Sequence, residues 1–494
     1  MSEATADARA EEPANRQVCG GETKWLVLIL VVAALLRGLV VGSFDRLEPF
    51  GDQLAYLEGA RELQAGESYT GSRGPAYSAA IALAWFVSGG DGSSLTAPRV
   101  LNVLLSLALL VLVWANGRKL FGPRVGLAAA AVLAIHPNYV TFPVYLLSEN
   151  LYNVTVAGGV LLALHSLGAR TACALAAGCV LGLGTLTREM LAWFVPCLAV
   201  LLAILDRSEP KRALRGAVAL VLGAALVVLP WTARNASVHD RFILVGFGDG
   251  IPLFEGNYVA PAYMKKAQGR WKGQPVKQAK WILFHEFKER GAKTKLDRNA
   301  LYREEAWKAI RERQPTWIFE KLASNGSDLV QPRLQTPVLW GGETSEALSG
   351  FLRVGMLGLF LPLHALLFLL VPIGLARWRF SGLALVPLSY VAFSFAAHVV
   401  ANAGPMRFQM PHEWILILAA ASAVLSAVPM KKWVSGGLFV IVVAAHAGAT
   451  DAWRELGAAL FSGDATAHEE WQEEFVPFGE GDEPSGAGQS EKQE

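Results

Sequence analysis

The sequence predicts an all-α, polytopic membrane protein. Of its 494 residues, 53% are hydrophobic and only 17% are charged, and the mean hydropathy of +0.35 lies above the range that is usual for soluble proteins. Apolar segments of roughly 17 to 25 residues, the length that a helix needs to cross a bilayer, recur along most of the chain. The loops between them are short and carry basic residues. These observations predict about eleven transmembrane helices.

The first apolar segment, residues 24–44, predicts a retained signal anchor. The preceding tail, residues 1–23, is polar and of mixed charge, and no small-residue cleavage site follows the apolar run. We expect this tail to be cytoplasmic, so that the first span leads outward. Residues 45–97 then form the first outer loop.

The apolar stretch 75–89 within this outer loop is not expected to be a span. It is short, begins at Pro75 and ends in two glycines. Counting it as a span would place Arg118, Lys119 and Arg124 outside, whereas short basic loops usually stay in the cytoplasm. We therefore expect a juxtamembrane or re-entrant helix here.

With that assignment, the remaining basic loops all fall on the cytoplasmic side. The further expected spans are 98–115, 125–142, 150–168, 171–186, 190–205, 216–231, 350–375, 382–401, 412–428 and 433–449. The last span ends outside, so the C-terminus is expected on the outer face.

Two polar regions complete the expected domain organisation. Residues 232–349 lie between spans and should form a periplasmic cap, with one or two amphipathic helices over 281–313. Residues 450–494 are acidic and rich in Gly, Ser and Gln from about 464, so we expect this tail to be mostly disordered. The transmembrane part is thereby divided into residues 24–231 and residues 350–449.

Charge and cysteine usage exclude two classes of function. The formal net charge is only +2 and the basic residues are spread over short loops, which argues against nucleic-acid binding. Cys173, Cys179 and Cys197 lie in apolar segments and Cys19 lies in the N-terminal tail. The outer loops therefore offer neither a disulfide pair nor a thiolate metal site.

Asp52 is the first candidate for chemistry. It lies in the first outer loop with Tyr56, Glu58, Arg61 and Arg73, where charged groups first meet water at a membrane surface. A carboxylate costs about 2.5 to 3.5 kcal/mol at mid-membrane and less at the interface, so it is usually solvated, paired or functional. A solvated loop acid is the alternative, and the polar neighbours favour a site.

An ordered set of segments between about residues 20 and 430 resembles a known superfamily. The segments are GDQLAYLEGARELQAG, RGPAY, APRVLNVLL, HPNYVTFPVYLLSENLY, GLGTLTRE, PWTARN, GIPLFEGN and RFQMPHE. In this order they resemble polyprenyl-phosphate-sugar glycosyltransferases of the GT-C superfamily. The nearest branch is glycosyltransferase family 39, with its protein O-mannosyltransferases and lipid A aminoarabinose transferases. The resemblance implies a GT-C fold with residues 24–231 as the catalytic module.

The resemblance implies that Asp52 is the catalytic acid of the first outer loop. A carboxylate can take the proton of an acceptor hydroxyl, and a phosphate leaving group needs no second acid to protonate it. Some relatives carry two adjacent acids where this chain has Asp52-Gln53, which puts a two-carboxylate arrangement within this loop in doubt, and Asp45 and Glu48 are nearby substitutes.

By the same resemblance, Glu149 matches the acid of the second outer loop. Asp52 and Glu149 would then share a proton or hold a divalent cation, although no cofactor is certain. The alternative for Glu149 is an acid favoured by the helix dipole in the first turn of 150–168.

Three arginines on the expected outer face, Arg73, Arg188 and Arg407, are candidates for holding the donor phosphate. Their alternative is snorkelling toward lipid headgroups. Tyr56 and Tyr77 are candidates for stacking on sugar or lipid. His136 is a candidate for lining the cavity, for which a packed or capping residue is the commoner alternative.

The expected function is that of an inverting glycosyltransferase in the inner (plasma) membrane, part of the cell envelope machinery. It would move a hexosyl or pentosyl group from a polyprenyl-phosphate donor to a hydroxyl of a glycan, lipid or protein on the outer face. Its partners would be that donor, the acceptor and membrane lipids. The alternatives are a transporter or flippase of lipid-linked glycans and an oligosaccharide polymerase or ligase. A transporter would place ionisable residues deep inside several spans.

Overall fold

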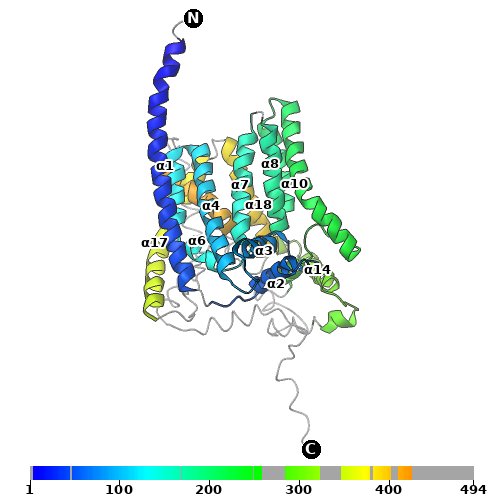
Figure 1. Ribbon diagram of the computed structural model, residues 1–494. Coiled ribbons are helices and arrows are strands. Elements are labelled where there is room, and N and C mark those ends of the chain that lie inside the picture. Colours follow the sequence, from blue (N-terminus) through cyan, green and yellow to red (C-terminus); the bar gives the residue numbers. More distant parts are fainter. Residues whose placement is uncertain are drawn as a thin grey trace, which may run out of the picture.

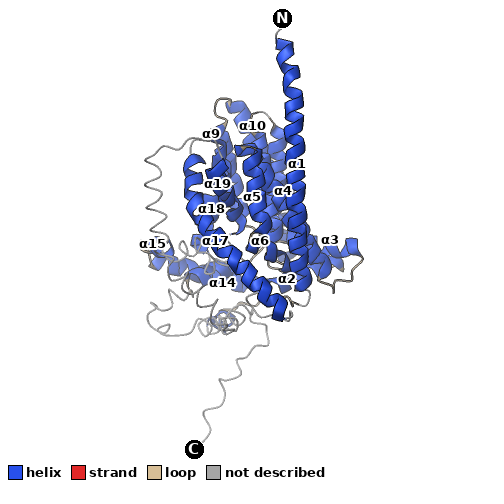
Figure 2. Cartoon of the chain, turned by 90° about the vertical axis from the view of Figure 1, so that its left-hand side faces the viewer, coloured by secondary structure: helices blue, strands red, loops and turns tan. Residues whose placement is uncertain are grey.

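The computed structural model describes residues 4–44, 47–168, 170–248, 250–258, 283, 285–322, 346–378, 382–401 and 410–425. Over these ranges the secondary structure is helical and contains no strand, as Figure 2 shows. The predicted all-α class is therefore confirmed.

Long helices run side by side, and shorter ones lie across one end of the bundle (Figure 1). The bundle contains α1 (Ala4–Ser43), α4 (Thr96–Phe121), α5 (Pro123–Ile135), α6 (Pro137–Thr141), α7 (Glu149–Ser166), α8 (Thr171–Thr187), α9 (Leu191–Leu205), α10 (Pro210–His239), α17 (Glu346–Trp378), α18 (Leu385–Ala401) and α19 (Met410–Leu425). The shorter helices at its end are α2 (Asp52–Gln64), α3 (Ala76–Ser88), α11 (Gly250–Asn257), α14 (Lys295–Glu312) and α15 (Trp317–Lys321).

Several of these helices can cross a membrane. Among the described residues, five are long and apolar enough, and a bent pair makes a sixth if it counts as one span. The five are Gly21–Ser43, Thr96–Phe121, Pro210–His239, Gly358–Ala376 and Gly382–Ala401. The predicted spans 171–186, 190–205 and 412–428 correspond to the shorter apolar helices α8, α9 and α19. The chain is thus a multi-pass membrane protein; the predicted span 433–449 lies outside the described residues.

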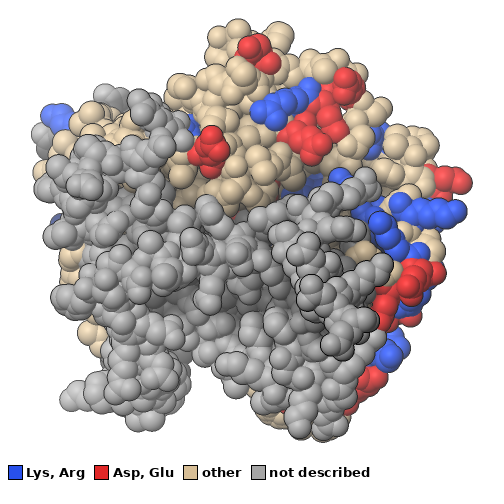
Figure 3. Space-filling view, turned by 90° about the horizontal axis from the view of Figure 1, so that it is seen from below, with Lys and Arg blue, Asp and Glu red and all other residues tan. Residues whose placement is uncertain are grey.

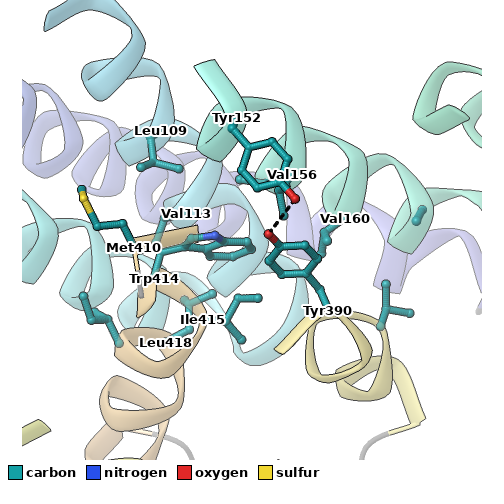
Figure 4. Close-up of a cluster of buried hydrophobic side chains, with 14 of the residues drawn as sticks. Leu109, Val113, Tyr152, Val156, Val160, Tyr390, Met410, Trp414, Ile415 and Leu418 are labelled. Carbon is teal, nitrogen blue, oxygen red and sulfur yellow. Dashed lines mark hydrogen bonds between the residues drawn. The ribbon is translucent and has the colours of Figure 1, made fainter. Parts of the chain in front are cut away.

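The helices differ in where they bury their side chains. In the span of α1 only 22% of the most apolar window is buried inside the protein, and in that of α17 only 25%. By contrast, α7 buries Glu149 and most of the residues up to Leu164. Figure 4 shows Tyr152, Val156 and Val160 of α7 facing Tyr390 of α18 and Trp414 of α19. The apolar outer surface of the bundle is therefore suited to contact with lipid. Helix α7 lies at the centre of the bundle.

Small residues allow α8 and α10 to pack closely. A Cβ atom on Gly178 would lie 2.0 Å from the carbonyl oxygen of Leu220, and one on Gly223 would lie 2.2 Å from that of Leu175. Both glycines are therefore required by the approach of the two backbones, as is common between helices in membranes.

The predicted single span 125–142 is broken. Helix α5 ends at Ile135, and the following segment Pro137–Val144 is bent from it by 63°. Pro137 has no N–H to continue the helical ladder. Arg37 of α1 donates hydrogen bonds to the carbonyls of Leu133 (3.1 Å) and Ala134 (3.0 Å), which satisfies carbonyls at the end of α5.

The predicted basic loop 116–124 is mostly helical. Helix α4 continues to Phe121 and α5 begins at Pro123, so that only Gly122, with φ of 95°, separates them. Arg118 and Lys119 occupy the last turn of α4, where cations complement the helix dipole. This end of α4 lies opposite α2 and α3 (Figure 1).

The structure has helices in the stretch 75–89 and within 281–313. Helix α3 occupies most of the stretch 75–89 and lies across the lower end of the bundle (Figure 1). Helix α14 begins with a capping box between Thr294 and Asp297 and packs on α11 around Phe254 and Ala306. Helix α11 is attached to α18 because Asn257 Nδ2 donates to the carbonyl of Val400, at 3.0 Å. The predicted tail 450–494 lies outside the described residues.

Candidate active site

Asp52 is the first residue of α2. The preceding residue, Gly51, has φ of 54° and ψ of −127°, a conformation that favours glycine and lets the loop turn sharply into the helix. A carboxylate in this first turn is stabilised by the helix dipole. The local sequence Gly-Asp therefore both starts the helix and orients the acid.

Asp52 is paired with Arg73. The carboxylate oxygen Oδ1 accepts a hydrogen bond from a terminal guanidinium nitrogen of Arg73. The side chains of Asp52 and Arg73 are 14% and 39% exposed, so this pair faces water. The Arg73 guanidinium also lies 5.8 Å from the ring centre of Tyr56, within the range of a cation–π contact.

Two neighbours hold Arg73 in place. A Cβ atom on Gly74 would lie 2.2 Å from the carbonyl oxygen of Leu186, so only glycine allows this turn to approach the end of α8. The hydroxyl of Tyr69 donates to the carbonyl of Arg73 at 3.0 Å. Burial raises the pKa of Tyr69 to about 12, which keeps that hydroxyl protonated as a donor. The loop that carries Arg73 is therefore fixed against α8.

Glu149 is the first residue of α7 and is paired with Arg188, which directly follows α8. Glu149 Oε1 and a terminal nitrogen of Arg188 are 2.6 Å apart, and the two side chains are 1% and 19% exposed. The Arg188 guanidinium lies 5.8 Å from the ring centre of Tyr152. The hydroxyl of Tyr152 accepts a hydrogen bond from that of Tyr390 at 3.3 Å (Figure 4). This pair is therefore embedded in the bundle.

The irregular segment before Glu149 is held by side chains of α4. Asn102 Nδ2 donates to the carbonyls of Pro143 (3.2 Å) and Tyr145 (2.9 Å), and Arg99 Nε donates to that of Val144 (3.3 Å). Backbone carbonyls outside a helix need such partners when they are buried. These contacts determine where the chain enters α7 and hence where Glu149 lies.

A chain of one cation–π contact and two hydrogen bonds connects the two ion pairs. The hydroxyl of Tyr56, whose ring lies beside Arg73, donates to Ser148 Oγ at 2.9 Å. Ser148 Oγ in turn lies 3.5 Å from Glu149 Oε2. Four segments distant in sequence thus meet at the end of the bundle that carries α2 and α3. Viewed from that end, described acidic and basic side chains lie beside one another along one side of the face (Figure 3).

Other predicted site residues occupy different positions. Tyr77 is fully buried, donates from its hydroxyl to Asn102 Oδ1 at 2.9 Å and packs edge-on against Tyr56. His136 is also fully buried, and its ring contacts Glu413, Tyr139 and Phe360. Tyr77 therefore joins α3 to α4, and His136 packs inside the bundle. Arg407 and Asp45 lie outside the described residues.

Sequence reasoning did not single out Ser148, Tyr152 or Tyr390. Tyr390, Ser394 and His398 recur every four residues along α18 and are buried. Burying such a row of polar side chains in a membrane costs free energy unless they have hydrogen-bond partners. This spacing could have indicated from the sequence that α18 faces other polar groups.

The predicted cation site between Asp52 and Glu149 contains only two carboxylates. The described part of the chain holds no group of three or more His, Cys, Asp or Glu side chains arranged to bind a metal ion. Each of the two carboxylates is bonded to an arginine.

One segment of the chain matches the model of a known protein family. Residues 72–233 match the family model described as dolichyl-phosphate-mannose-protein mannosyltransferase. This match confirms the resemblance to GT-C glycosyltransferases within that segment, which includes Arg73, Glu149 and Arg188. The segment is less than half of the chain, and Asp52 precedes it.

No curated protein sequence matches the chain. Among solved structures, the oligosaccharyltransferase AglB from Archaeoglobus fulgidus, in complex with an inhibitory peptide and a dolichol-phosphate, is similar with a TM-score of 0.46 and 14% identity, over 92% of this chain and 60% of AglB. ArnT from Cupriavidus metallidurans bound to undecaprenyl phosphate is similar with a TM-score of 0.37 and 17% identity, over 80% of this chain and 78% of ArnT.

Proposed function

We propose that this protein is an inverting glycosyltransferase that takes a sugar from a polyprenyl-phosphate carrier and passes it to a hydroxyl group. The observation that supports this most is the meeting of two carboxylate–arginine pairs at one end of a membrane bundle. The match of residues 72–233 to a sugar-transferring family supports it independently. The sugar is a hexose or pentose, and the acceptor is a glycan, lipid or protein.

In this proposal, Asp52 is the general base. Its side chain is partly exposed and is paired with an arginine that is itself 39% exposed, so both groups are accessible to ligands. An acceptor hydroxyl within hydrogen-bond reach would give its proton to Asp52 as its oxygen attacks the anomeric carbon. The bond from that carbon to the phosphate oxygen breaks on the opposite face, which inverts the configuration. The leaving phosphate keeps the electron pair.

Arg73 is the proposed partner of the donor phosphate. A guanidinium binds phosphate oxygens through two parallel N–H donors and stabilises the charge that develops as the sugar leaves. Glu149 is more deeply buried and holds Arg188, so its proposed role is to orient that guanidinium near the same ligand. The active face is the end with α2 and α3, opposite the basic ends of α4 and α10, which we assign to the cytoplasm.

The test is Asp52→Asn in membranes supplied with a labelled polyprenyl-phosphate sugar. Removing the base should lower the transfer rate at least about 100-fold while donor binding is retained. Asp91→Asn is the matched control, because Asp91 is an exposed acid in the turn after α3 whose carboxylate accepts hydrogen bonds from Ser93. Transfer by Asp52→Asn at the rate of the control would remove Asp52 from the mechanism.

A transporter or flippase would give a different result in the same assay. It would move the lipid-linked sugar between leaflets without forming a new glycosidic bond, so both variants would release no transferred product. The readout of bond formation therefore separates the two classes.

A further inference from the structure

The contact between α2 and the segment before α7 involves two side chains on one face of α2. Gln53 and Tyr56 are three residues apart and are 3% and 4% exposed. Side chains at this spacing point to the same side of a helix. Both reach toward residues 146–148, which lead directly into Glu149.

Gln53 makes a bond that an apolar side chain could not make. Its amide oxygen accepts a hydrogen bond from the backbone N–H of Leu146, at 2.9 Å. Leu146 is fully buried and lies between the 3-10 turn Phe142–Val144 and α7, where no helical ladder serves this N–H. An unsatisfied N–H here would cost free energy comparable to a lost hydrogen bond.

The contact also joins the two candidate carboxylates. Gln53 directly follows Asp52, and Leu146 precedes Glu149 by three residues. One turn further along α2, the hydroxyl of Tyr56 donates to Ser148 Oγ, the neighbour of Glu149, at 2.9 Å. Two hydrogen bonds on one helix face therefore determine how far α2 stands from the start of α7.

We propose that Gln53 is a positioning residue, which together with Tyr56 sets the spacing between Asp52 and Glu149 and their arginines. We call the two hydrogen bonds that Gln53 and Tyr56 make to Leu146 and Ser148 the clamp. The expected effect of the clamp on transfer rests on the proposed function, but the clamp itself is a property of the fold. The hydroxyl of Tyr56 is then a structural element of the clamp.

The first measurement does not need activity. Hydrogen exchange of the peptide that contains Leu146 is compared between the wild-type protein and Gln53→Met, which keeps the length of the side chain and removes the acceptor. We expect the exchange of the Leu146 amide to become about tenfold faster, the loss of one hydrogen bond. Unchanged exchange would overturn the clamp, whatever the protein catalyses.

The second measurement is transfer kinetics. Because a misplacement of about 1 Å can cost 100-fold in rate, Gln53→Met should lower kcat by about 10- to 100-fold and leave the donor KM within about threefold. Gln53→Glu retains an acceptor for the Leu146 N–H and should recover kcat to within about threefold of wild type. Glu58→Gln, on the exposed side of α2, is the matched control and should behave as wild type.

Two results would overturn the positioning role. One is a kcat of Gln53→Met equal to that of the control, and the other is a Gln53→Glu variant as impaired as Gln53→Met.

If Gln53→Met does not fold, Tyr56→Phe provides a second test. This variant removes only the hydrogen bond from Tyr56 to Ser148 and should lower kcat about three- to tenfold. A wild-type kcat in Tyr56→Phe would count against the clamp. Absence of transfer in the wild-type protein would refute the proposed function, whereas the exchange result would still decide the clamp.

Discussion

The two ion pairs of the site have the same chemistry and opposite surroundings. Asp52 and Arg73 are 14% and 39% exposed, whereas Glu149 and Arg188 are 1% and 19% exposed. A water-facing pair contributes little to stability. A buried pair is strongly coupled to the fold, because removing either partner leaves a charge without compensation. The comparison therefore distinguishes the Asp52–Arg73 pair, which is accessible to ligands, from the Glu149–Arg188 pair, which stabilises the structure of the site.

The largest expected effect comes from breaking the buried pair. Glu149→Ala leaves the guanidinium of Arg188 without its carboxylate and should destabilise the protein by about 3 to 5 kcal/mol. Asp52→Ala, the matched change in the exposed pair, should cost less than about 1 kcal/mol. Unfolding of both variants in detergent, followed by tryptophan fluorescence, measures the difference.

A double variant provides the control for this prediction. Glu149→Leu with Arg188→Leu removes both charges and should recover much of the stability that Glu149→Ala loses. Equal losses of stability in Asp52→Ala and Glu149→Ala would contradict the distinction between the two pairs.

An intermediate effect is expected from the exposed arginine. Arg73→Ala removes a charged hydrogen-bond donor worth about 1.5 to 3 kcal/mol, so the donor KM should rise roughly 10- to 100-fold. Arg61→Ala removes the same charge from an exposed position of α2 and should leave the donor KM unchanged. Kinetics at about 0.1 M and 1 M salt sharpen the test, because screening weakens exposed charges most. The wild-type KM should rise with salt more steeply than that of Arg73→Ala.

The last effect concerns pH dependence and a buried lysine that is bonded to a carbonyl. Lys321 Nζ donates to the carbonyl of Gly256 at 2.8 Å. Burial, and then the neighbouring Arg313, lowers the pKa of Lys321 from 10.5 to about 7. Between these values the unfolded chain binds more protons than the folded one, so stability should increase as the pH rises above about 7.

The variant Lys321→Met tests this prediction. It removes the titrating group, so its unfolding free energy should vary less between pH 6.5 and about 9 than that of the wild-type protein. If the unfolding free energies of the two proteins varied with pH in the same way, the pKa of Lys321 would be the same in the folded and unfolded states, and the prediction would be wrong.

Much of the fold follows from local sequence. The length of the apolar run before Ser43, the basic residues around Gly122 and the Pro-Gly boundaries of the stretch 75–89 predicted two spans and the separate helix α3. The break at His136-Pro137 was not predicted, although proline is a strong local signal. The carbonyls of Leu133 and Ala134 before the break accept hydrogen bonds from Arg37, which lies about 100 residues earlier in the chain. Apolar composition alone predicts one continuous helix across this segment.

The candidate site was predicted less completely. Asp52, Arg73, Glu149 and Arg188 were all singled out, but their pairing was not, because each acid could have bonded to several cations. Tyr56 and Tyr77 were expected to touch ligand, and the structure uses their hydroxyls to join helices. The segment 150–168 was predicted as a span, but the central position of α7, where Glu149 and most of its other residues are buried, was not.

By itself the sequence determined the class of protein, the order of the apolar helices and the residue types available for chemistry, because hydrophobicity, glycine and proline act over a few residues. Only the tertiary structure decided which arginine meets which acid, which pair is buried and what Gln53 binds. These depend on how helices distant in sequence pack, and packing follows from side-chain shape and hydrogen bonding across the whole bundle.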